Sequence, residues 1–284
     1  MRCSLAVWSG PALALWAAAS AHAQSYLSPN PPPDVIEARF RLEVDALYGT
    51  YDTRLRLDNT TLNTPGTSVS GEDDLGLDKS QFLGQVELTL LPGEHHFVRL
   101  GVLSMRRSGS HVLTRDVSWK NDTFFAGERV DSFLNLSLVG LTYGYMPFRT
   151  DRYDVAATFG LHIVDASGNV TQGTPVSFDS DSGVGALPLL GLEGHYDFTR
   201  RWSAEARFEF ASASWASVFG ADLKGLSAKV TDARLAVRYR PTQHLLFGLG
   251  YRRFKIEVDA PNSNPAGSVS LQLSAPLLFM QGSL

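Results

Sequence analysis

Residues 38–58 read ARFRLEVDALYGTYDTRLRLD and alternate between apolar and charged side chains with almost no error in the first half. One parity holds Phe40, Leu42, Val44, Ala46 and Tyr48, and the other holds Arg39, Arg41, Glu43 and Asp45. A period of two predicts a β-strand with two different faces. A soluble sandwich rarely carries a solid column of charge on one face. The pattern therefore predicts a barrel strand whose apolar face meets lipid and whose charged face lines the interior.

The second half of the same stretch changes parity. After Tyr48 the apolar positions are Tyr51, Leu55 and Leu57. This predicts a β-bulge at residues 49–50 that moves the apolar side chains back onto the lipid face. The alternative is an unbroken strand, in which Arg54 and Arg56 face outward, toward lipopolysaccharide phosphates. A barrel strand crosses the bilayer with about 9–11 residues, so we expect the outer half of this strand to project beyond the membrane.

Ten alternating runs follow one another: 38–57, 81–91, 96–107, 129–146, 153–164, 186–198, 202–210, 229–240, 245–258 and 268–280. Short connections occur at 92–95, 147–152, 199–201 and 241–244, and long polar connections at 58–80, 108–128, 165–185, 211–228 and 259–267. Alternating short and long connections are typical of outer-membrane barrels. The sequence thus predicts an all-β, transmembrane, antiparallel up-and-down barrel of about ten strands, with eight or twelve as alternatives.

The N-terminal region predicts export. Arg2 precedes the apolar run LAVWSGPALALWAAAS, which ends in AHA at residues 21–23. We predict a cleaved signal peptide at 1–23, a Pro-rich segment at 24–36 and the barrel at 37–284. An anchoring helix is the alternative. The only cysteine, Cys3, lies inside the predicted signal peptide, and the net charge of −4 gives no indication of nucleic-acid binding.

Aromatic residues gather beside the short connections. They are Tyr143, Tyr145, Phe148, Tyr153, Tyr196, Phe198, Trp202 and Tyr239. Membrane barrels carry girdles of aromatic side chains at the membrane interfaces. The positions therefore predict a periplasmic aromatic girdle, with ordinary strand-end aromatics as the alternative.

Charges of both signs have the inward parity. They are Arg39, Arg41, Glu43, Asp45, Glu87, Arg99, Glu193, Glu205, Arg207, Glu209, Arg234 and Arg238. A ten-stranded barrel is narrow, so these side chains are expected to pair across the lumen. We interpret them as a salt-bridged, hydrated plug, with a narrow polar pore as the alternative. Arg207 is expected to pair with Glu205, Glu209 and Asp232.

Other polar groups give weaker signals. His162 and His195 share inward parity on neighbouring runs, where a histidine with a carboxylate can act as a base or bind a metal. The acidic loop GEDDLGLD at 71–78 offers oxygen ligands for a divalent cation, although its spacing fits no EF-hand. We interpret it as a solvated acidic loop, with a cation site as the alternative. Ser108, Ser110 and His111 lie near the predicted outer rim. We assign no catalytic, cofactor or metal site.

Three stretches carry a resemblance: EDDLGLD at 72–78, LLPGEHHFVRLG at 90–101 and RRSG at 106–109. With them the chain resembles the uncharacterised outer-membrane β-barrel proteins of Gram-negative bacteria. The resemblance implies a barrel in the bacterial outer membrane and brings no settled activity.

We expect a structural or small-pore role. The alternatives are an outer-leaflet enzyme, lipid A-modifying or omptin-like, and a surface-binding protein that acts through its long loops. The expected partners are outer-membrane lipid, lipopolysaccharide and the outer-membrane assembly machinery. We expect no nucleic acid and no cofactor, and a monomer.

Overall fold

The computed structural model describes residues 39–58, 64–119, 122–172, 183–212, 227–260 and 266–284. Ten long strands form the wall: β1 (Phe40–Leu57), β3 (Ser80–Gly93), β4 (His96–Val112), β7 (Arg129–Arg149), β8 (Tyr153–Gln172), β9 (Gly183–Asp197), β10 (Trp202–Ser212), β11 (Ser227–Tyr239), β12 (Leu245–Ala260) and β13 (Gly267–Ser283). The short β2 (Val69–Ser70) pairs with β1, and β5 (Val117–Trp119) pairs with β6 (Asp122–Phe124). The predicted signal peptide and Pro-rich segment lie outside the described residues.

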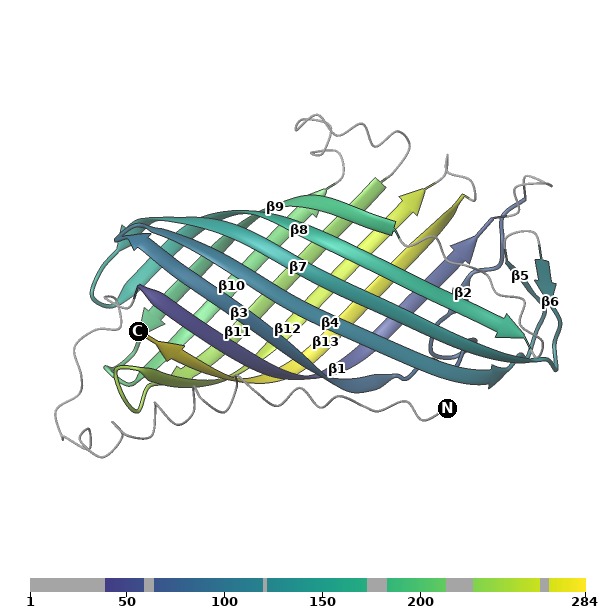
Figure 1. The fold of residues 1–284 in the computed structure, drawn as a ribbon, viewed down its shortest axis with the longest axis horizontal. Helices are drawn as coiled ribbons and strands as arrows, with labels where there is room; N and C mark the ends of the chain where they lie inside the picture. The colour runs from purple at the N-terminus through teal and green to yellow at the C-terminus, as the bar shows by residue number, and fades with distance from the viewer. Residues whose placement is uncertain (1–38, 59–63, 120–121, 173–182, 213–226, 261–265) are drawn as a thin grey trace, which may run out of the picture. The chain divides into compact units, whose positions relative to one another are not determined.

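The sheet closes on itself. Each long strand pairs antiparallel with the next one along the chain, and β13 returns to pair with β1 (Figure 1). Closure satisfies the backbone hydrogen-bonding groups that an open sheet edge would leave unpaired. The prediction of an all-β, ten-stranded antiparallel transmembrane barrel is confirmed. In the described part of the chain, no helix has the length and apolarity needed to span a membrane.

The two ends of the barrel differ in their connections. Short turns join β3 to β4, β7 to β8, β9 to β10 and β11 to β12, on the left in Figure 1. The strand ends that the long connections join lie at the other end. We call these the turn end and the loop end. Both termini of the barrel strands, Phe40 and Ser283, belong to the turn end, where Phe40 and Leu284 exchange backbone hydrogen bonds of 3.3 and 3.0 Å.

The predicted bulge in β1 is wrong. β1 pairs with β13 in one unbroken register, from Arg41 opposite Ser283 to Leu57 opposite Gly267. Tyr51 therefore points inward and is 8% exposed, whereas the side chain of Arg54 points outward and is 72% exposed. The parity of the apolar residues changes because the lumen itself changes from charged to apolar at this height. The unbroken alternative is the observed one.

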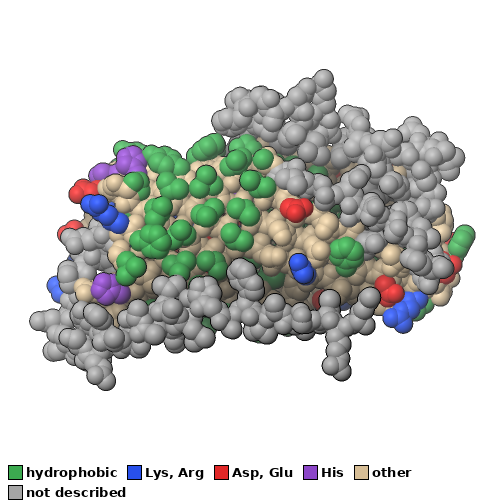
Figure 2. Space-filling view, viewed as in Figure 1, with side chains coloured by type: hydrophobic (Ala, Val, Ile, Leu, Met, Phe, Trp, Pro, Cys, Tyr) green, Lys and Arg blue, Asp and Glu red, His purple; other side chains and the backbone are tan. Residues whose placement is uncertain are grey.

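The two faces of the wall are inverted relative to a soluble protein. The outward residues Phe40, Leu42, Val44 and Tyr48 are each about two-fifths exposed. In contrast, the inward Asp45 is 3% exposed. Figure 2 shows the apolar side chains gathered over the turn-side part of this face of the barrel. Such an apolar outer band is what a barrel wall needs where it meets hydrocarbon.

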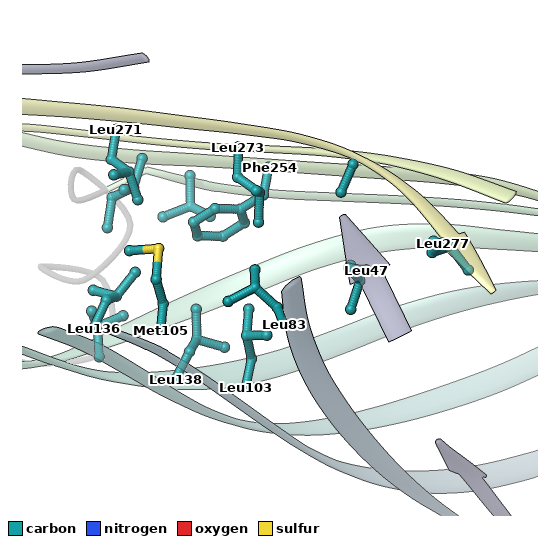
Figure 3. Packing of buried hydrophobic residues seen from close by; sticks show 14 of the residues in the cluster. Leu47, Leu83, Leu103, Met105, Leu136, Leu138, Phe254, Leu271, Leu273 and Leu277 are labelled. Carbon is teal, nitrogen blue, oxygen red and sulfur yellow. The ribbon is translucent and has the colours of Figure 1, made fainter. Parts of the chain in front are cut away.

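The largest hydrophobic cluster of the described residues lies inside the lumen and is most extensive toward the loop end. A smaller one at the turn end contains Leu91, Phe97, Met146 and Ala156. We call the following inward residues the apolar layer: Leu47, Tyr51, Leu83, Leu103, Met105, Leu136, Leu138, Val164, Leu187, Leu189, Ala211, Ala228, Val230, Phe254, Ile256, Leu271 and Leu273. Side chains from opposite walls meet in this cluster, as Leu138 and Phe254 illustrate in Figure 3. Burying each large apolar side chain contributes about 1.5–3 kcal/mol.

Candidate functional site: an ionic layer, an apolar layer and a cap

Several inward columns of side chains change from charged to apolar about halfway along their strands. On β1, the charged Glu43 and Asp45 are followed by Leu47. On β10, Arg207 and Glu209 are followed by Ala211. Because strands alternate, a residue two positions along points to the same side but lies one step higher in the barrel. The charged half faces the turn end. We call its members the ionic layer: Glu43, Asp45, Glu87, Arg99, Glu193, Glu205, Arg207, Glu209, Asp232, Arg234, Arg238 and Arg252.

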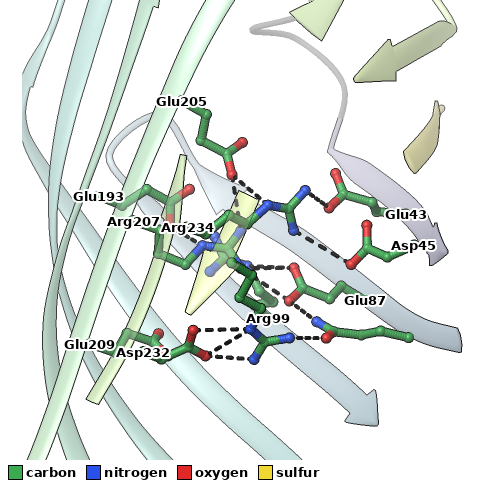
Figure 4. A network of polar contacts seen from close by, with 12 residues as sticks. Glu43, Asp45, Glu87, Arg99, Glu193, Glu205, Arg207, Glu209, Asp232 and Arg234 are labelled. Atoms are coloured by element: carbon green, nitrogen blue, oxygen red, sulfur yellow. Dashed lines mark hydrogen bonds and ion pairs between the residues drawn. The ribbon is translucent and has the colours of Figure 1, made fainter. Parts of the chain in front are cut away.

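Arg207 connects three strands within the ionic layer. Its Nη1 donates a 3.0 Å hydrogen bond to Glu87 Oε1 on β3, across the lumen. Its Nε lies 3.5 Å from Glu193 Oε2, and its Nη2 lies 3.6 Å from Glu205 Oε1 (Figure 4). Of the expected partners, only Glu205 pairs with Arg207. Glu209 lies 3.8 Å from His162 Nε2 instead, and Asp232 receives Arg252 at 2.5 Å.

Arg234 forms a second junction of the same kind. Its Nη2 donates to Glu43 Oε1 at 2.7 Å, and its Nη1 lies 3.5 Å from Asp45 Oδ2. Its Nε lies 3.6 Å from Glu205, and its guanidinium stacks 4.5 Å above the Phe279 ring. Buried ion pairs add little net stability but tie charges to specific partners. The layer therefore fixes how β1, β10 and β11 face one another.

The turn end of the ionic layer opens into a small cavity of about 70 Å³. Arg41 is half-buried at its wall, and Arg39 is exposed beside it. His195 lies between two carboxylates, with Nδ1 3.5 Å from Asp154 and Nε2 3.4 Å from Asp197. The two acids approach opposite ring nitrogens, so the three groups do not converge on one point. Nowhere in the described ranges do three or more metal-ligating side chains form a metal site.

At the loop end, Arg107 holds the first long loop in the barrel mouth. Its side chain is fully buried, and its Nη2 lies 2.5 Å from Glu72 Oε1. It also donates hydrogen bonds to Thr53 Oγ1 at 2.7 Å and to the Asp78 carbonyl at 2.7 Å. Its guanidinium stacks 4.2 Å above the Tyr51 ring. The expectation of a solvated acidic loop is thus wrong for Glu72, because the loop turns this carboxylate inward.

Two of the stretches that carried the resemblance contact each other here. Gly76 of EDDLGLD has φ +69°, a conformation that favours glycine. Gly109 of RRSG lies so close that a Cβ there would overlap the Gly76 backbone. A β-bridge joins Leu77 to Gly109. The ion pair between Arg107 and Glu72 and the contact between the two glycines thus make one unit from both stretches.

Above this unit the first two long loops pack together. Their shared apolar cluster contains Val69, Leu75, Leu113, Val117, Phe124, Val130 and Val170. Thr67 N donates to the Ser118 carbonyl at 2.9 Å, and Arg115 pairs with Asp74 at 2.9 Å. At the surface, the hydrogen bond from Lys79 lowers the pKa of Asp73. We call the described residues 67–79 and 113–130 the cap.

The candidate serine and histidine at the outer rim do not form a pair. Ser108 and Ser110 are exposed on the outward face of β4. His111 has the opposite parity and is half-buried toward the lumen. Neighbouring residues of a strand point to opposite faces, so the strand itself separates these groups.

The predicted girdle residues lie outward at the turn end. Tyr143, Tyr145, Tyr153, Tyr196, Phe198, Trp202 and Tyr239 lie on or next to the ends of β7, β8, β9, β10 and β11. Tyr143 OH lies 2.7 Å from His96 Nδ1, and the rings of Trp202 and Tyr239 are 4.8 Å apart. Phe198 is 59% exposed and contacts Tyr196 with its ring edge. The belt marks one edge of the apolar band.

The sequence interpretation missed Arg252 and Arg107. Arg252 forms the bidentate pair of the ionic layer with Asp232, an expected partner of Arg207, and Arg107 anchors the cap. The inward position of Arg107 could have been predicted from parity, because Arg107 lies an even number of positions after the inward Arg99 on the same strand. The spacing did not reveal its partner, because Glu72 belongs to a loop without periodicity.

Comparison with solved structures identifies the fold. The outer membrane protease OmpT from Escherichia coli aligns with a TM-score of 0.54 at 10% identity, covering 91% of this chain and 99% of that one. The translocator domain of the autotransporter NalP from Neisseria meningitidis aligns with a TM-score of 0.40 at 10% identity, covering 96% of each chain. At these identities the likeness shows the fold alone. No protein-family model and no curated protein matches the sequence.

Proposed function

We propose that the protein is a closed, non-conducting barrel of the bacterial outer membrane that holds its cap at the cell surface. The structural role anticipated from the sequence is thereby preferred to the small-pore role. We also propose that it belongs with the Gram-negative barrel proteins that its three sequence stretches resemble. The placement is supported by the fold, which the chain shares with the outer-membrane barrel of OmpT.

The apolar layer is the observation that carries the proposal. Residues from opposite walls fill the lumen between the ionic layer and the cap. Leu273 is 2% exposed, Phe254 1% and Leu189 1%, so water has little access to this level. An ion would lose its hydration here without gaining polar partners, which is strongly unfavourable.

Single-channel recording in planar bilayers tests the closure. We expect no conductance steps from the parent protein. The double variant Leu138→Ala, Phe254→Ala removes apolar bulk from both walls and should produce steps. The matched variant Glu87→Gln, Arg207→Gln removes charge from the ionic layer but keeps side-chain size, and it should stay silent because the apolar layer is intact.

The outcomes separate the two roles. Conductance by the parent would overturn the closed barrel and favour the small pore. If only the ionic-layer variant conducts, the ionic layer rather than the apolar layer is what blocks ions. Each variant should first migrate as a heat-modifiable band on a denaturing gel, which shows that it has folded.

The surface position of the cap has its own test. The chain has one cysteine, Cys3 in the predicted signal peptide, so a single introduced cysteine in the barrel can be labelled selectively. Phe125→Cys replaces a cap residue that is 58% exposed, and Phe198→Cys replaces a turn-end residue that is 59% exposed. A membrane-impermeant maleimide should label the first variant in intact cells and the second only after lysis. The reverse result would invert the orientation.

A further inference from the structure

A collar of outward polar residues follows the apolar band on the loop side. On β12 the outward sequence passes from Tyr251 to Arg253, and Arg253 lies opposite Ser274 of β13. On β4 it passes from Val102 through Ser104 to Arg106. Arg106 lies opposite Asn135 of β7. The change from apolar to polar therefore occurs on both sides of the barrel.

Most outward cations on the loop side have an acidic partner. The pairs are Arg54 with Asp52 at 3.6 Å, Arg56 with Asp58 at 3.0 Å, Lys255 with Glu257 at 2.6 Å, Arg129 with Asp131 at 3.6 Å and Lys79 with Asp73 at 2.8 Å. Lys229 has no carboxylate at ion-pair distance among the described residues, but it lies opposite Glu257, two outward positions farther from the apolar band than Arg253.

Arg106 and Arg253 are different. Among the described residues, neither has a carboxylate at ion-pair distance. The guanidinium of Arg253 donates only to the amide oxygen of Gln272, at 3.0 Å. Both arginines are exposed, and both lie within two outward positions of the apolar band. A cation at this depth is unfavourable without an anion, and its planar fork matches phosphate oxygens.

We propose that Arg106 and Arg253 bind the phosphates of a phosphorylated glycolipid, the lipid A type, in the outer leaflet. The proposal rests on the orientation given under Proposed function, in which the loop end faces outward. Acyl chains would cover the apolar band below each arginine, while the head-group phosphates meet the guanidinium at the band's edge. Ser104 and Gln272 beside the two arginines offer neutral hydrogen-bonding groups to the same head groups.

Native mass spectrometry of the full chain in neutral detergent tests the site. The probes are diphosphorylated lipid A, the same lipid after enzymatic removal of its phosphates, and phosphatidylglycerol. We expect the parent to retain lipid A at least tenfold more tightly than either comparison lipid. The double variant Arg106→Gln, Arg253→Gln should lose about tenfold in affinity for lipid A per arginine, because a charge-assisted contact is lost at each site.

The paired cations provide the matched control. Arg54→Gln, Lys255→Gln removes the same charge from the same collar and should change lipid A affinity less than about threefold, since these side chains already have acidic partners. Equal retention of phosphatidylglycerol and lipid A by the parent would overturn the proposal, as would a double variant that binds like the parent. Because the maleimide labelling is independent of lipid binding, a wrong orientation is distinguishable from a wrong site.

If the double variant does not fold, Arg106→Lys, Arg253→Lys keeps both charges and removes the planar fork. This variant should bind lipid A less tightly than the parent, but lose less than about tenfold per arginine, because the ammonium keeps the charge and lacks the planar fork. The proposal would also be overturned if this Lys double variant and the single variants Arg106→Gln and Arg253→Gln all bound lipid A as tightly as the parent.

Discussion

At the scale of single residues, Arg107 and Glu72 decide whether the first loop stays in the barrel mouth. Arg107→Ala leaves the Glu72 carboxylate buried without its cation, and losing one partner of a buried pair costs about 3–5 kcal/mol. The free energy of unfolding in urea, measured in lipid vesicles, should fall by that amount. Arg54→Ala is the control, because its pair with Asp52 is largely exposed and worth about 0–1 kcal/mol. Equal losses of stability in both variants would contradict the conclusion that the Arg107–Glu72 pair holds the loop in place.

Replacing both partners distinguishes charge from packing at the same place. Arg107→Met, Glu72→Leu substitutes apolar side chains for the pair, and such exchanges are often neutral or stabilising. We expect the double variant to recover most of the stability that Arg107→Ala loses, again read from urea unfolding. A double variant as unstable as Arg107→Ala would show that the hydrogen bonds to Thr53 and the Asp78 carbonyl matter more than the ion pair.

Two glycines with positive φ separate backbone strain from crowding. Gly76 has φ +69° and Gly127 has φ +87°. A Cβ at Gly76 would meet the Ser110 backbone, whereas one at Gly127 would meet open space. Left-handed conformation costs a residue with Cβ about 1–2 kcal/mol, so Gly127→Ala should show that loss alone. Gly76→Ala should lose more stability than this, because its Cβ would also clash, and the cap should then be cleaved faster by protease. Equal losses in the two variants would contradict the contribution of crowding.

At the scale of one element, β10 tests the inverted faces. Phe208 is outward and 48% exposed in the apolar band, between the inward Arg207 and Glu209. Phe208→Arg should cost about 2–4 kcal/mol if its position is at mid-bilayer, because an arginine would then face lipid. Phe125→Arg in the cap, where the parent residue is 58% exposed, should cost little. Folding of Phe208→Arg into bilayers as stably as the parent would reverse the assignment of the two faces.

At the scale of the whole molecule, closure and layering predict a resistant barrel. No strand edge is open between β13 and β1, and the ionic layer and the apolar layer both join opposite walls. Unheated protein should therefore migrate on a denaturing gel as a compact band that shifts on boiling, and fractionation should place it in the outer membrane. Recovery of folded protein from the soluble periplasm would contradict both the outer-membrane location and the proposed function.

The sequence alone determined the strands, the faces of their turn-side halves and the barrel architecture, because a period of two between two different solvents is a local pattern. It also gave the inward parity of Glu87, Arg207 and Arg234, and hence the presence of lumen charge. Which charges meet was decided only by the tertiary structure. Arg207 and Glu87 are 120 positions apart, and their contact depends on how the wall curves.

The dependence on contacts across the lumen also explains why the predicted bulge in β1 is wrong. A local pattern equates apolar with lipid-facing, but the lumen becomes apolar toward the loop end, so Tyr51 and Leu47 belong inside. The apolar layer in the lumen forms only when the inward side chains of several strands pack together in the closed barrel. The burial of Glu72 against Arg107 arises likewise, from a loop folding back onto a strand that the sequence places 35 residues away. The sequence determined the wall of this barrel, whereas only tertiary contacts across the lumen decided how the lumen is filled.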